Sequence, residues 1–453
     1  MRHAAALSFL LGASSALALG CDFGPVHGYE PDLGTEFSDT DLAIIRRELG
    51  NLPATPPADP TNAFADDRDA AVLGQELFFE PRYSQNGNIS CATCHDPNTG
   101  FQDASGNTSH GLMFTSRHTP TLLNVGYGTA RAGSTVWQYW DGRKDSLWSQ
   151  ALGPPENGME MGGSRVTIAL LIYDKYRQSY RALFGDMPAL RDANGVPVVS
   201  PTAVPPRVPG MDETPDNVAW DALSDTLKEQ ITDVYVNFGK AIAAYERLLV
   251  SRDSRFDQFY AEIAGGASRS KLLDDQEAMG LKVFIGNGRC ISCHLGPNLT
   301  DWKFHNIGVD QTGDNIPALD DGRRDGLAEV VNDPFNCAGR YSDRPDKSGC
   351  AVSTIAIDDA ATQPYAGAFK TPGLRSVSQT APYFHTGEEQ SLDDVVEHYD
   401  EGGDTDGFAG KVDSNVTRLN LTDDEKAALV AFLKTLDGAP LPASLTTAPP
   451  LPQ

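Results

Sequence analysis

The chain contains 453 residues, in which 62 aspartates and glutamates outnumber 36 lysines and arginines and give a formal net charge of −26. Such an acidic surface repels phosphate backbones, which argues against nucleic acid as a partner. The length is sufficient for two or three domains.

The first residues, MRHAAALSFLLGASSALALGC, have the composition of an export signal over residues 1–20. The stretch is too rich in Ala, Ser and Gly to predict a membrane span. Its end resembles a lipobox, which would place a lipid on Cys21, and simple cleavage with a free Cys21 is the alternative. We therefore expect a periplasmic protein that contacts the membrane only through a lipid at Cys21. Residues 21–66 are rich in Pro, Asp and Thr, contain one helix-like stretch at 39–49, and are predicted to form a tether.

A first unit is expected over residues 67–265. It opens with RDAAVLGQELFFE, residues 68–80, whose apolar positions recur at helical spacing, and it leads into the motif CATCH. Residues 166–185 and 220–263 also have helical patterns. The insert at 188–215 is rich in Pro and Gly and is predicted to be a surface loop.

A second unit is expected over residues 266–438 and repeats the same order. An amphipathic helix at 274–286 precedes the motif CISCH, and a long insert follows at 309–361. The stretch 421–436 combines a Thr-x-x-Glu capping box with an apolar stripe, which predicts a helix. The proline-rich tail, 439–453, is expected to be disordered.

The two CxxC pairs, each followed directly by a histidine, carry the chemistry of the sequence. They are Cys91/Cys94 with His95 and Cys290/Cys293 with His294. A zinc ribbon places its pairs roughly 15–20 residues apart, whereas these lie roughly 200 residues apart, and their helical flanks do not suit a thioredoxin-like dithiol. Haem attachment uses every residue, because two thiols add to the vinyl groups and the adjacent imidazole binds the iron. We predict two covalently bound haem c groups in a mainly α fold, made of two cytochrome c-like haem domains packed together with long loops.

Two further cysteines lie in the second insert. Cys337 and Cys350 bracket a polar loop, and in an oxidising compartment they are expected to form a disulfide. Two free thiols are the alternative.

The ligand opposite His294 is not fixed by the residues alone. No methionine follows Met279, so the second unit cannot supply the usual thioether after its haem motif. A phenolate would favour ferric and higher oxidation states, whereas a thioether favours ferrous iron. The remaining candidates are a tyrosine, a lysine, His305, His385 and His398.

The far side of the first haem has several candidate ligands. They are His110, Met113 and His118. The position could equally be open, in which case hydrogen peroxide could bind there.

From about Leu73 to Leu436 the chain resembles the bacterial dihaem cytochrome c peroxidases and their MauG-type relatives. The motifs that carry this resemblance are LGQELFFEPRYSQNGNISCATCH, RHTPTLLN (117–124), WDGRKDSLWSQALGPPENGMEMG (140–162), FHNIG (304–308), LRSVSQTAPYFHTG (374–387) and VVEHYDEGG (395–403). In this family the N-terminal haem meets peroxide and the C-terminal haem stores or relays electrons.

The resemblance also implies roles for single residues. Glu160, with Gln150 beside it, corresponds to the distal acid–base group that moves a proton between the peroxide oxygens. Trp140 corresponds to an inter-haem electron stepping stone. His110 falls at a loop histidine that caps the first haem in resting peroxidases, which makes it a candidate resting-state ligand. Tyr399 stands where the peroxidase branch has methionine and the MauG-like branch has tyrosine, so we expect it opposite His294.

Two departures from the family pattern matter. The family has Arg-Asn-Thr-Pro where this chain has His118 in place of the asparagine, which supplies an oxygen to an inter-domain calcium. The other oxygens would match the carbonyls of Thr380 and Pro382, but histidine is a poor calcium ligand, which disfavours the ion here. MauG also carries a surface tryptophan before its second CxxCH, where this chain has Gly288 and Arg289.

Three functional hypotheses follow. The first is a peroxide-dependent, MauG-like enzyme that oxidises a partner protein, favoured by Tyr399. The second is a cytochrome c peroxidase that takes electrons from a small cytochrome or copper protein, favoured by His110. The third is a dihaem electron carrier without peroxide chemistry, which the WDGR…Q…E pattern argues against.

Overall fold

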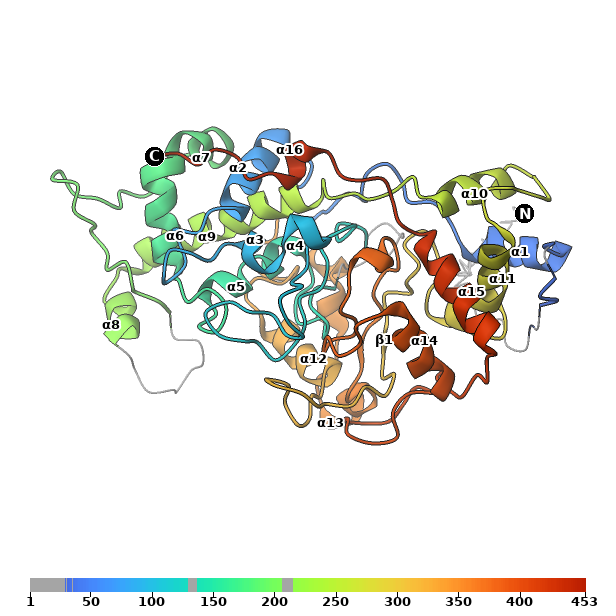
Figure 1. The fold of residues 1–453 in the computed structure, drawn as a ribbon. Helices are drawn as coiled ribbons and strands as arrows, with labels where there is room; N and C mark the ends of the chain where they lie inside the picture. Colours follow the sequence, from blue (N-terminus) through green and yellow to red (C-terminus); the bar gives the residue numbers. More distant parts are fainter. Residues whose placement is uncertain (1–28, 30, 35, 129–136, 206–214) are drawn as a thin grey trace, which may run out of the picture.

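A computed structural model describes residues 29, 31–34, 36–128, 137–205 and 215–453 (Figure 1). The predicted export signal and Cys21 lie outside these residues. The fold is mainly helical, with helices α1 (Asp39–Glu48), α2 (Arg68–Phe78), α3 (Cys91–Cys94), α4 (Leu147–Gln150), α5 (Gly153–Glu156), α6 (Arg165–Leu171), α7 (Arg177–Phe184), α8 (Pro215–Asp221), α9 (Asp225–Glu246), α10 (Arg255–Ala264), α11 (Asp275–Ile285), α12 (Arg323–Asn332), α13 (Asp359–Thr362), α14 (Leu392–Glu401), α15 (Asp423–Lys434) and α16 (Ala443–Thr446). No helix among the described residues is both long and apolar enough to cross a membrane.

The predicted helices form where an apolar stripe begins beside a capping side chain. The predicted helix at 68–80 is α2, whose first amides are capped by the Asp67 carboxylate. The Thr422–Glu425 capping box is confirmed at the start of α15. The stretch 220–263, predicted as continuously helical, is instead divided. It breaks after Glu246, and the Ser254 side chain begins α10 by accepting a hydrogen bond from the Asp257 amide.

A first hydrophobic cluster forms where α2 crosses α9. The crossing is close at Gly74, where an added Cβ would lie 1.9 Å from the Ala241 carbonyl oxygen. Phe78 and Tyr245 pack across the same crossing with their ring centroids 5.1 Å apart. Cys91 and Ala92 of α3, the first CxxCH motif, pack against this cluster.

A second hydrophobic cluster repeats the arrangement where α11 crosses α15. Here Gly280 takes the place of Gly74, because its added Cβ would lie 1.9 Å from the Ala428 carbonyl oxygen. Phe284 and Phe432 pack with their centroids 5.2 Å apart. The weak internal repeat in the sequence is therefore a repeat of one helix pair in front of each CxxCH motif.

The prediction that residues 21–66 form a tether needs correction for the described part of that segment. Leu42 and Ile45 of α1 are buried in the second cluster with Phe256 and Phe259 of α10. Burial of this apolar stripe fixes α1 to the second half, and α10, assigned by sequence to the first unit, packs there too.

The tail, expected to be disordered, is also packed. It runs from the end of α15 back across the first half (Figure 1). Leu441 and Leu445 contact the first cluster, and the Tyr245 hydroxyl donates to the Leu445 carbonyl at 2.5 Å. Gln75 donates to the Ser444 carbonyl at 2.7 Å. The tail is rich in proline and forms only the short helix α16, but its half-buried leucines pack it against the first cluster.

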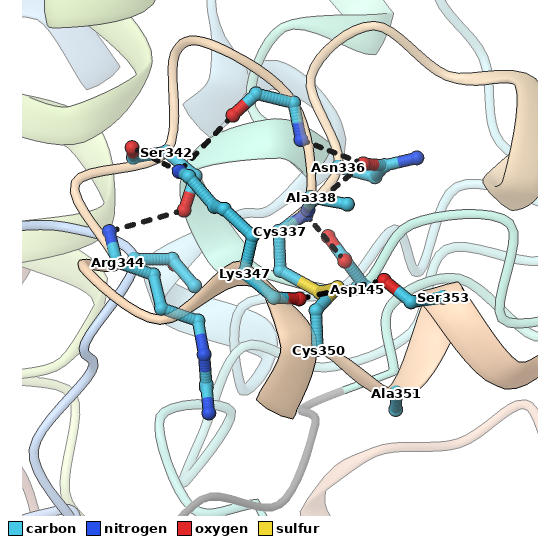
Figure 2. Close-up of a disulfide and its surroundings, with 12 residues drawn as sticks. Asp145, Asn336, Cys337, Ala338, Ser342, Arg344, Lys347, Cys350, Ala351 and Ser353 are labelled. Atoms are coloured by element: carbon cyan, nitrogen blue, oxygen red, sulfur yellow. Dashed lines mark hydrogen bonds between the residues drawn. A yellow bond between two sulfur atoms is a disulfide. The ribbon is translucent and has the colours of Figure 1, made fainter.

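The inserts are anchored rather than free. Leu190, Val199 and Ala203 of the 188–215 insert are buried in the first cluster, so this segment is only in part the surface loop that was predicted. The second insert contains the predicted Cys337–Cys350 disulfide, which is confirmed (Figure 2).

The main chain of the disulfide loop forms hydrogen bonds with a residue outside the loop and with a side chain inside it. The Cys337 amide donates to the buried Asp145 carboxylate at 2.7 Å, and Lys347 donates to the Ser342 carbonyl at 2.7 Å (Figure 2). Because Asp145 belongs to the first half, the disulfide loop ties the second insert onto that half.

The described strands form one small antiparallel sheet at the junction of the two halves. It contains β1 (Phe304–His305) and β2 (Phe369–Lys370), with Phe304 opposite Lys370. This sheet lies against the WDGR turn, because the Lys370 amide donates to the Trp140 carbonyl at 2.7 Å.

Candidate active site

Both CxxCH motifs open into one continuous cavity of about 590 Å³ that runs between the two halves. Most of the residues singled out from the sequence line it: Cys91, Cys94, His95, Trp140, Gln150, Glu160, Cys290, Cys293, His294, Thr380, Pro382 and Tyr399. Segments far apart in the chain are therefore brought together around a single space.

The two candidate haem-binding histidines have the same local geometry. His95 Nδ1 lies 3.0 Å from the Phe101 carbonyl oxygen, and His294 Nδ1 lies 2.9 Å from that of Leu299. Phe101 and Leu299 share a left-handed backbone, with φ of 59° and 53°. A carbonyl acceptor fixes the proton on Nδ1 and leaves Nε2 with its lone pair for a metal.

The electrostatics of both sites also suit iron. Burial lowers the pKa of His95 to about 4 and lowers that of His294, so both imidazoles are neutral at physiological pH. The four motif cysteines form no disulfide, and burial raises the pKa of Cys91 and Cys290 to about 12. Neutral, unpaired thiols beside a neutral imidazole fit covalent haem attachment better than a thiolate metal site or a redox dithiol.

Glu160 is positioned at the first motif by a tight turn after α5. The Asn157 amide nitrogen donates to Glu160 Oε1 at 2.7 Å, and the Leu112 amide donates to the Glu160 carbonyl at 2.8 Å. Burial raises the pKa of Glu160, although the cation of Arg143 and the Asn157 hydrogen bond oppose the shift. A carboxyl group with a raised pKa holds a proton more readily than a free carboxylate does, which suits a group that must accept a proton and return it.

Two residues beside Glu160 were not predicted. The Arg143 guanidinium lies 3.6 Å from the ring centroid of Tyr139, and the Tyr139 hydroxyl lies 3.4 Å from the Gln150 carbonyl oxygen. Tyr139 also has a left-handed backbone, with φ of 62°. Arg143 belongs to the WDGR motif, whereas no sequence signal marks Tyr139.

Trp140 is held by both halves of the molecule. Its indole Nε1 donates to the His118 carbonyl at 2.8 Å, and its own carbonyl accepts from the Lys370 amide at 2.7 Å. The next residue, Asp141, forms buried ion pairs with Arg117 and Arg143. Although burial opposes ionisation, these two cations hold the pKa of Asp141 below its usual value.

The two segments that hold Trp140 are themselves a repeat. They read HTPTLLNV, from His118 to Val125, and KTPGLRSV, from Lys370 to Val377. Asn124 and Ser376, at matching positions, both have φ of 59°, and their amides donate to carbonyls that follow α9 and α15. Comparing these two strings would have pointed to Lys370, which the sequence analysis missed.

Tyr399 lines the cavity from α14. Its hydroxyl makes no hydrogen bond within the described residues, and burial raises its pKa, with the Cys293 and Cys290 thiols adding to the shift. A ferric ion would favour the phenolate that burial alone disfavours.

The histidine alternatives to Tyr399 are engaged elsewhere. His305 lies 2.9 Å from Asp301 and 2.6 Å from Asp413, and although burial opposes its charge, Asp301, the Cys293 thiol and Asp413 raise its pKa to about 11. His385 Nε2 lies 2.8 Å from the Gln311 amide nitrogen, and His398 Nε2 lies 3.0 Å from the Ile307 carbonyl oxygen. Each of these three histidines therefore has at least one ring nitrogen in a hydrogen bond, whereas the Tyr399 hydroxyl has none among the described residues.

The candidate ligands for the first haem are not assembled in this structure. His110 is exposed, stacks on Phe114 with centroids 4.1 Å apart, and does not line the cavity. Met113 is 54% exposed. A role for His110 as a resting-state ligand therefore requires its loop to rearrange. The remaining candidate, His118, lines the cavity but has both ring nitrogens in hydrogen bonds.

Calcium does not fit the residues at the position that the family resemblance suggests. His118 Nε2 lies 2.5 Å from Gln102 Oε1, and His118 Nδ1 lies 3.0 Å from the Asn107 carbonyl oxygen. Gln102 in turn donates to the Ala381 carbonyl, between Thr380 and Pro382. Direct hydrogen bonds therefore connect the halves where a calcium ion would need oxygen ligands.

Comparisons with known proteins agree over nearly the whole chain. A sequence model of the di-haem cytochrome c peroxidase family matches residues 68–264. The methylamine utilization protein MauG of Methylorubrum extorquens is 29% identical over 415 residues, covering 91% of this chain and 90% of that protein. The cytochrome-c peroxidase IdrP1 of Denitromonas iodatirespirans is 30% identical over 403 residues, covering 86% of each. The crystal structure of a MauG-like protein associated with microbial copper homeostasis has a similar fold, with a TM-score of 0.58 at 23% identity, covering 88% of this chain and 98% of that one.

Proposed function

Because the chain belongs to the di-haem cytochrome c peroxidase family, we propose that it is a hydrogen-peroxide-dependent oxidoreductase of the MauG type that oxidises a partner protein. The observation that carries this choice is Tyr399. It lines the cavity beside the second CxxCH motif with an uncommitted hydroxyl, whereas no methionine follows Met279. A hard, anionic ligand favours the high oxidation states that such chemistry needs.

The proposed cofactors are two haem c groups, one on each motif. Cys91 and Cys94 would hold the first and Cys290 and Cys293 the second, with His95 and His294 as proximal ligands. Each haem would supply an iron that can exchange electrons, and the first would also provide the site for peroxide. Each motif, with its helix pair and its x-Thr-Pro segment, would form one cytochrome c-like domain. This assignment is supported by the matching Gly74 and Gly280 crossings.

Glu160 would serve as the acid–base group. Its carboxylate accepts a proton from one peroxide oxygen and returns it to the other, so that water leaves as the O–O bond breaks. The Asn157 side-chain amide holds the carboxyl group in place, and burial raises its pKa, which favours the protonated state that the return step needs. Gln150, at the end of α4, would orient the peroxide beside it.

Trp140 would connect the two redox centres. Its indole is hydrogen-bonded to the first half and its backbone carbonyl to the second, which keeps Trp140 in a fixed position between the two motifs. Such an aromatic bridge would let the oxidising equivalents be shared before a partner protein discharges them.

A cytochrome c peroxidase is the second candidate, with electrons from a small cytochrome or copper protein. It is favoured by the relative that is 30% identical and carries that name, and by the exposed loop that presents His110. In this case the first haem would become accessible only after one-electron reduction.

One experiment separates these activities. Peroxide is added to the diferric holoprotein, and its optical and near-infrared spectra are followed. A long-lived species with both irons oxidised supports the MauG-type proposal. Turnover of a cytochrome donor only after prior one-electron reduction supports the peroxidase instead, and no response to peroxide in any redox state would leave only an electron carrier.

We also propose export to the periplasm, which is supported by the composition of residues 1–20. Lipidation at Cys21 would tether the protein to the membrane. Cell fractionation tests both points. If Cys21 carries a lipid, the wild type should be found in the membrane fraction and Cys21→Ser in the soluble periplasmic fraction.

A further inference from the structure

The cavity wall contains several cations, and all but two have a carboxylate partner among the described residues. Arg117 pairs with Asp320 at 2.7 Å. Arg143 pairs with Asp141 at 2.7 Å, and Arg375 with Asp257 at 2.5 Å. The five lysines and arginines of the wall are Arg117, Arg143, Arg289, Lys370 and Arg375.

The two remaining cations differ in their surroundings. Arg289 is exposed and donates to the Thr417 hydroxyl at 2.9 Å. Lys370 Nζ makes no hydrogen bond or ion pair within the described residues, and its neighbour is the ring of Trp302, 5.6 Å away. Burial lowers the pKa of Lys370 to about 8. Lys370 is therefore the enclosed, uncompensated cation of the cavity.

The backbone places Lys370 at the junction of the two motifs. Its amide donates to the Trp140 carbonyl, and β2 pairs it with Phe304 of β1. Two residues later the segment reaches Pro372, which lines the same cavity as His294. The side chain thus extends from the strand that connects the inter-haem tryptophan to the second haem motif.

The repeated segment supplies an internal comparison. His118 holds the matching position in the first half, and its ring nitrogens bond to protein oxygens. Lys370, which is half-buried, has no such partner, although an unpaired ammonium group withdrawn from water is costly. A carboxylate is consequently missing from the protein part of this site. Haem carries two propionates, which are its only anionic groups, and the second motif brings one haem to this wall.

We propose that Lys370 Nζ binds a propionate of the haem held by His294, and that it sets the potential of that haem. This inference rests on the proposed haem attachment and goes beyond it. An unpaired propionate anion stabilises ferric iron, and a neighbouring ammonium group cancels that field. Lys370 therefore raises the potential of the second haem and partly offsets the ferric preference that a Tyr399 ligand would give it.

Spectroelectrochemical titration of the exported holoprotein tests this proposal. Lys370→Met should lower the midpoint potential of the second haem so that its one-electron equilibrium changes at least tenfold, which is about 59 mV. The first haem should keep its potential. Lys370→Arg, which preserves the charge, should shift the second haem by less than half of that amount.

Lys303→Met is the matched control. Lys303 is exposed and lies on the neighbouring segment, where its carbonyl accepts from the Thr371 amide at 3.0 Å. Its loss removes the same charge without emptying the cavity wall, so the second haem should keep its potential. An unchanged potential in Lys370→Met, or an equal shift in Lys303→Met, would overturn the proposal.

Measuring the haem content of each variant distinguishes a defect in haem attachment from a change in the potential of the second haem. Pyridine haemochrome assay should give two haems per chain in the wild type, and fewer would contradict the proposed function itself, whatever Lys370 does. If Lys370→Met and Lys370→Gln both fail to mature, Lys370→Arg decides. If Lys370→Arg binds two haems and the second haem keeps its potential, the positive charge at this position is what is required. If Lys370→Arg also fails to bind two haems, Lys370 has a packing role and the proposal is overturned.

Discussion

Replacing Glu160 by glutamine isolates its proton-transfer role. The Asn157 amide donates to Glu160 Oε1 at 2.7 Å, and a glutamine carbonyl oxygen can accept the same hydrogen bond. The contact of the Glu160 carbonyl with the Leu112 amide involves only backbone atoms and is retained. The variant should therefore fold and bind both haems as the wild type does.

The expected loss is in the reaction with peroxide. A positioned acid–base group contributes about 10²–10⁴-fold, so Glu160→Gln should slow the reaction by that factor, or about 2.7–5.4 kcal/mol of activation free energy. Stopped-flow mixing of the diferric holoprotein with peroxide measures the rate constant. Glu329→Gln is the control, because Glu329 lines the same cavity but is 60% exposed. A decrease of less than tenfold for Glu160→Gln would refute the acid–base assignment.

The pH profile gives a second signature of the same residue. Glu160 must be ionised to accept the first proton, and burial raises its pKa above 4.5. The wild-type rate constant for the reaction with peroxide should therefore fall as the pH drops through this raised pKa. The rate constant of Glu160→Gln should not fall over the same pH range.

Further outcomes can be checked independently. Tyr399→Phe should change the optical and EPR spectra of the second haem, and unchanged spectra would exclude Tyr399 as its ligand. EGTA should leave the unfolding temperature unchanged, because His118 offers calcium no oxygen, and a decrease that added calcium reverses would contradict this. Burial raises the pKa of Glu246 from 4.5 to about 8, so its stabilising contribution is complete below pH 4.5 and is lost as the pH rises through 8. In guanidinium unfolding, the free energy of unfolding of Glu246→Gln relative to that of the wild type should rise by up to about 1.4 kcal/mol for each unit of pH between 4.5 and 8. A difference that does not change with pH would contradict the raised pKa of Glu246. Removal of residues 439–453 should cost about 2–4 kcal/mol of unfolding free energy, through two leucines and two hydrogen bonds, and an unchanged denaturation midpoint would refute the packing role of the tail.

The sequence was most informative where chemistry or periodicity is local. The CxxCH motifs, the capped helices and the Cys337–Cys350 disulfide each depend on residues close together in the chain. The missing methionine argued against the usual ligand in the second half, and the resemblance to the MauG-like branch then pointed to Tyr399. These features need no knowledge of how distant segments pack.

Long-range packing decided the features that were missed. Nothing local in a proline-rich tail indicates that Leu445 reaches the first cluster, and composition alone favoured disorder. The same holds for α1, whose apolar stripe needed α10 and α11 as partners. Lys370 was overlooked because its importance lies in the absence of a carboxylate, and only the arrangement of the cavity wall reveals that absence.

Helix α1 and the C-terminal tail each pack on the half of the molecule that is farther away in the sequence, which affects how the protein can be divided and how it folds. The helix that precedes the first half is built into the second, and the segment that follows the second half completes the first. The molecule therefore has no single peptide bond at which two self-sufficient halves could be separated, and a cut near residue 265 would leave each fragment with an incomplete core. During synthesis the first half therefore cannot complete its core until the last residues of the chain have been made.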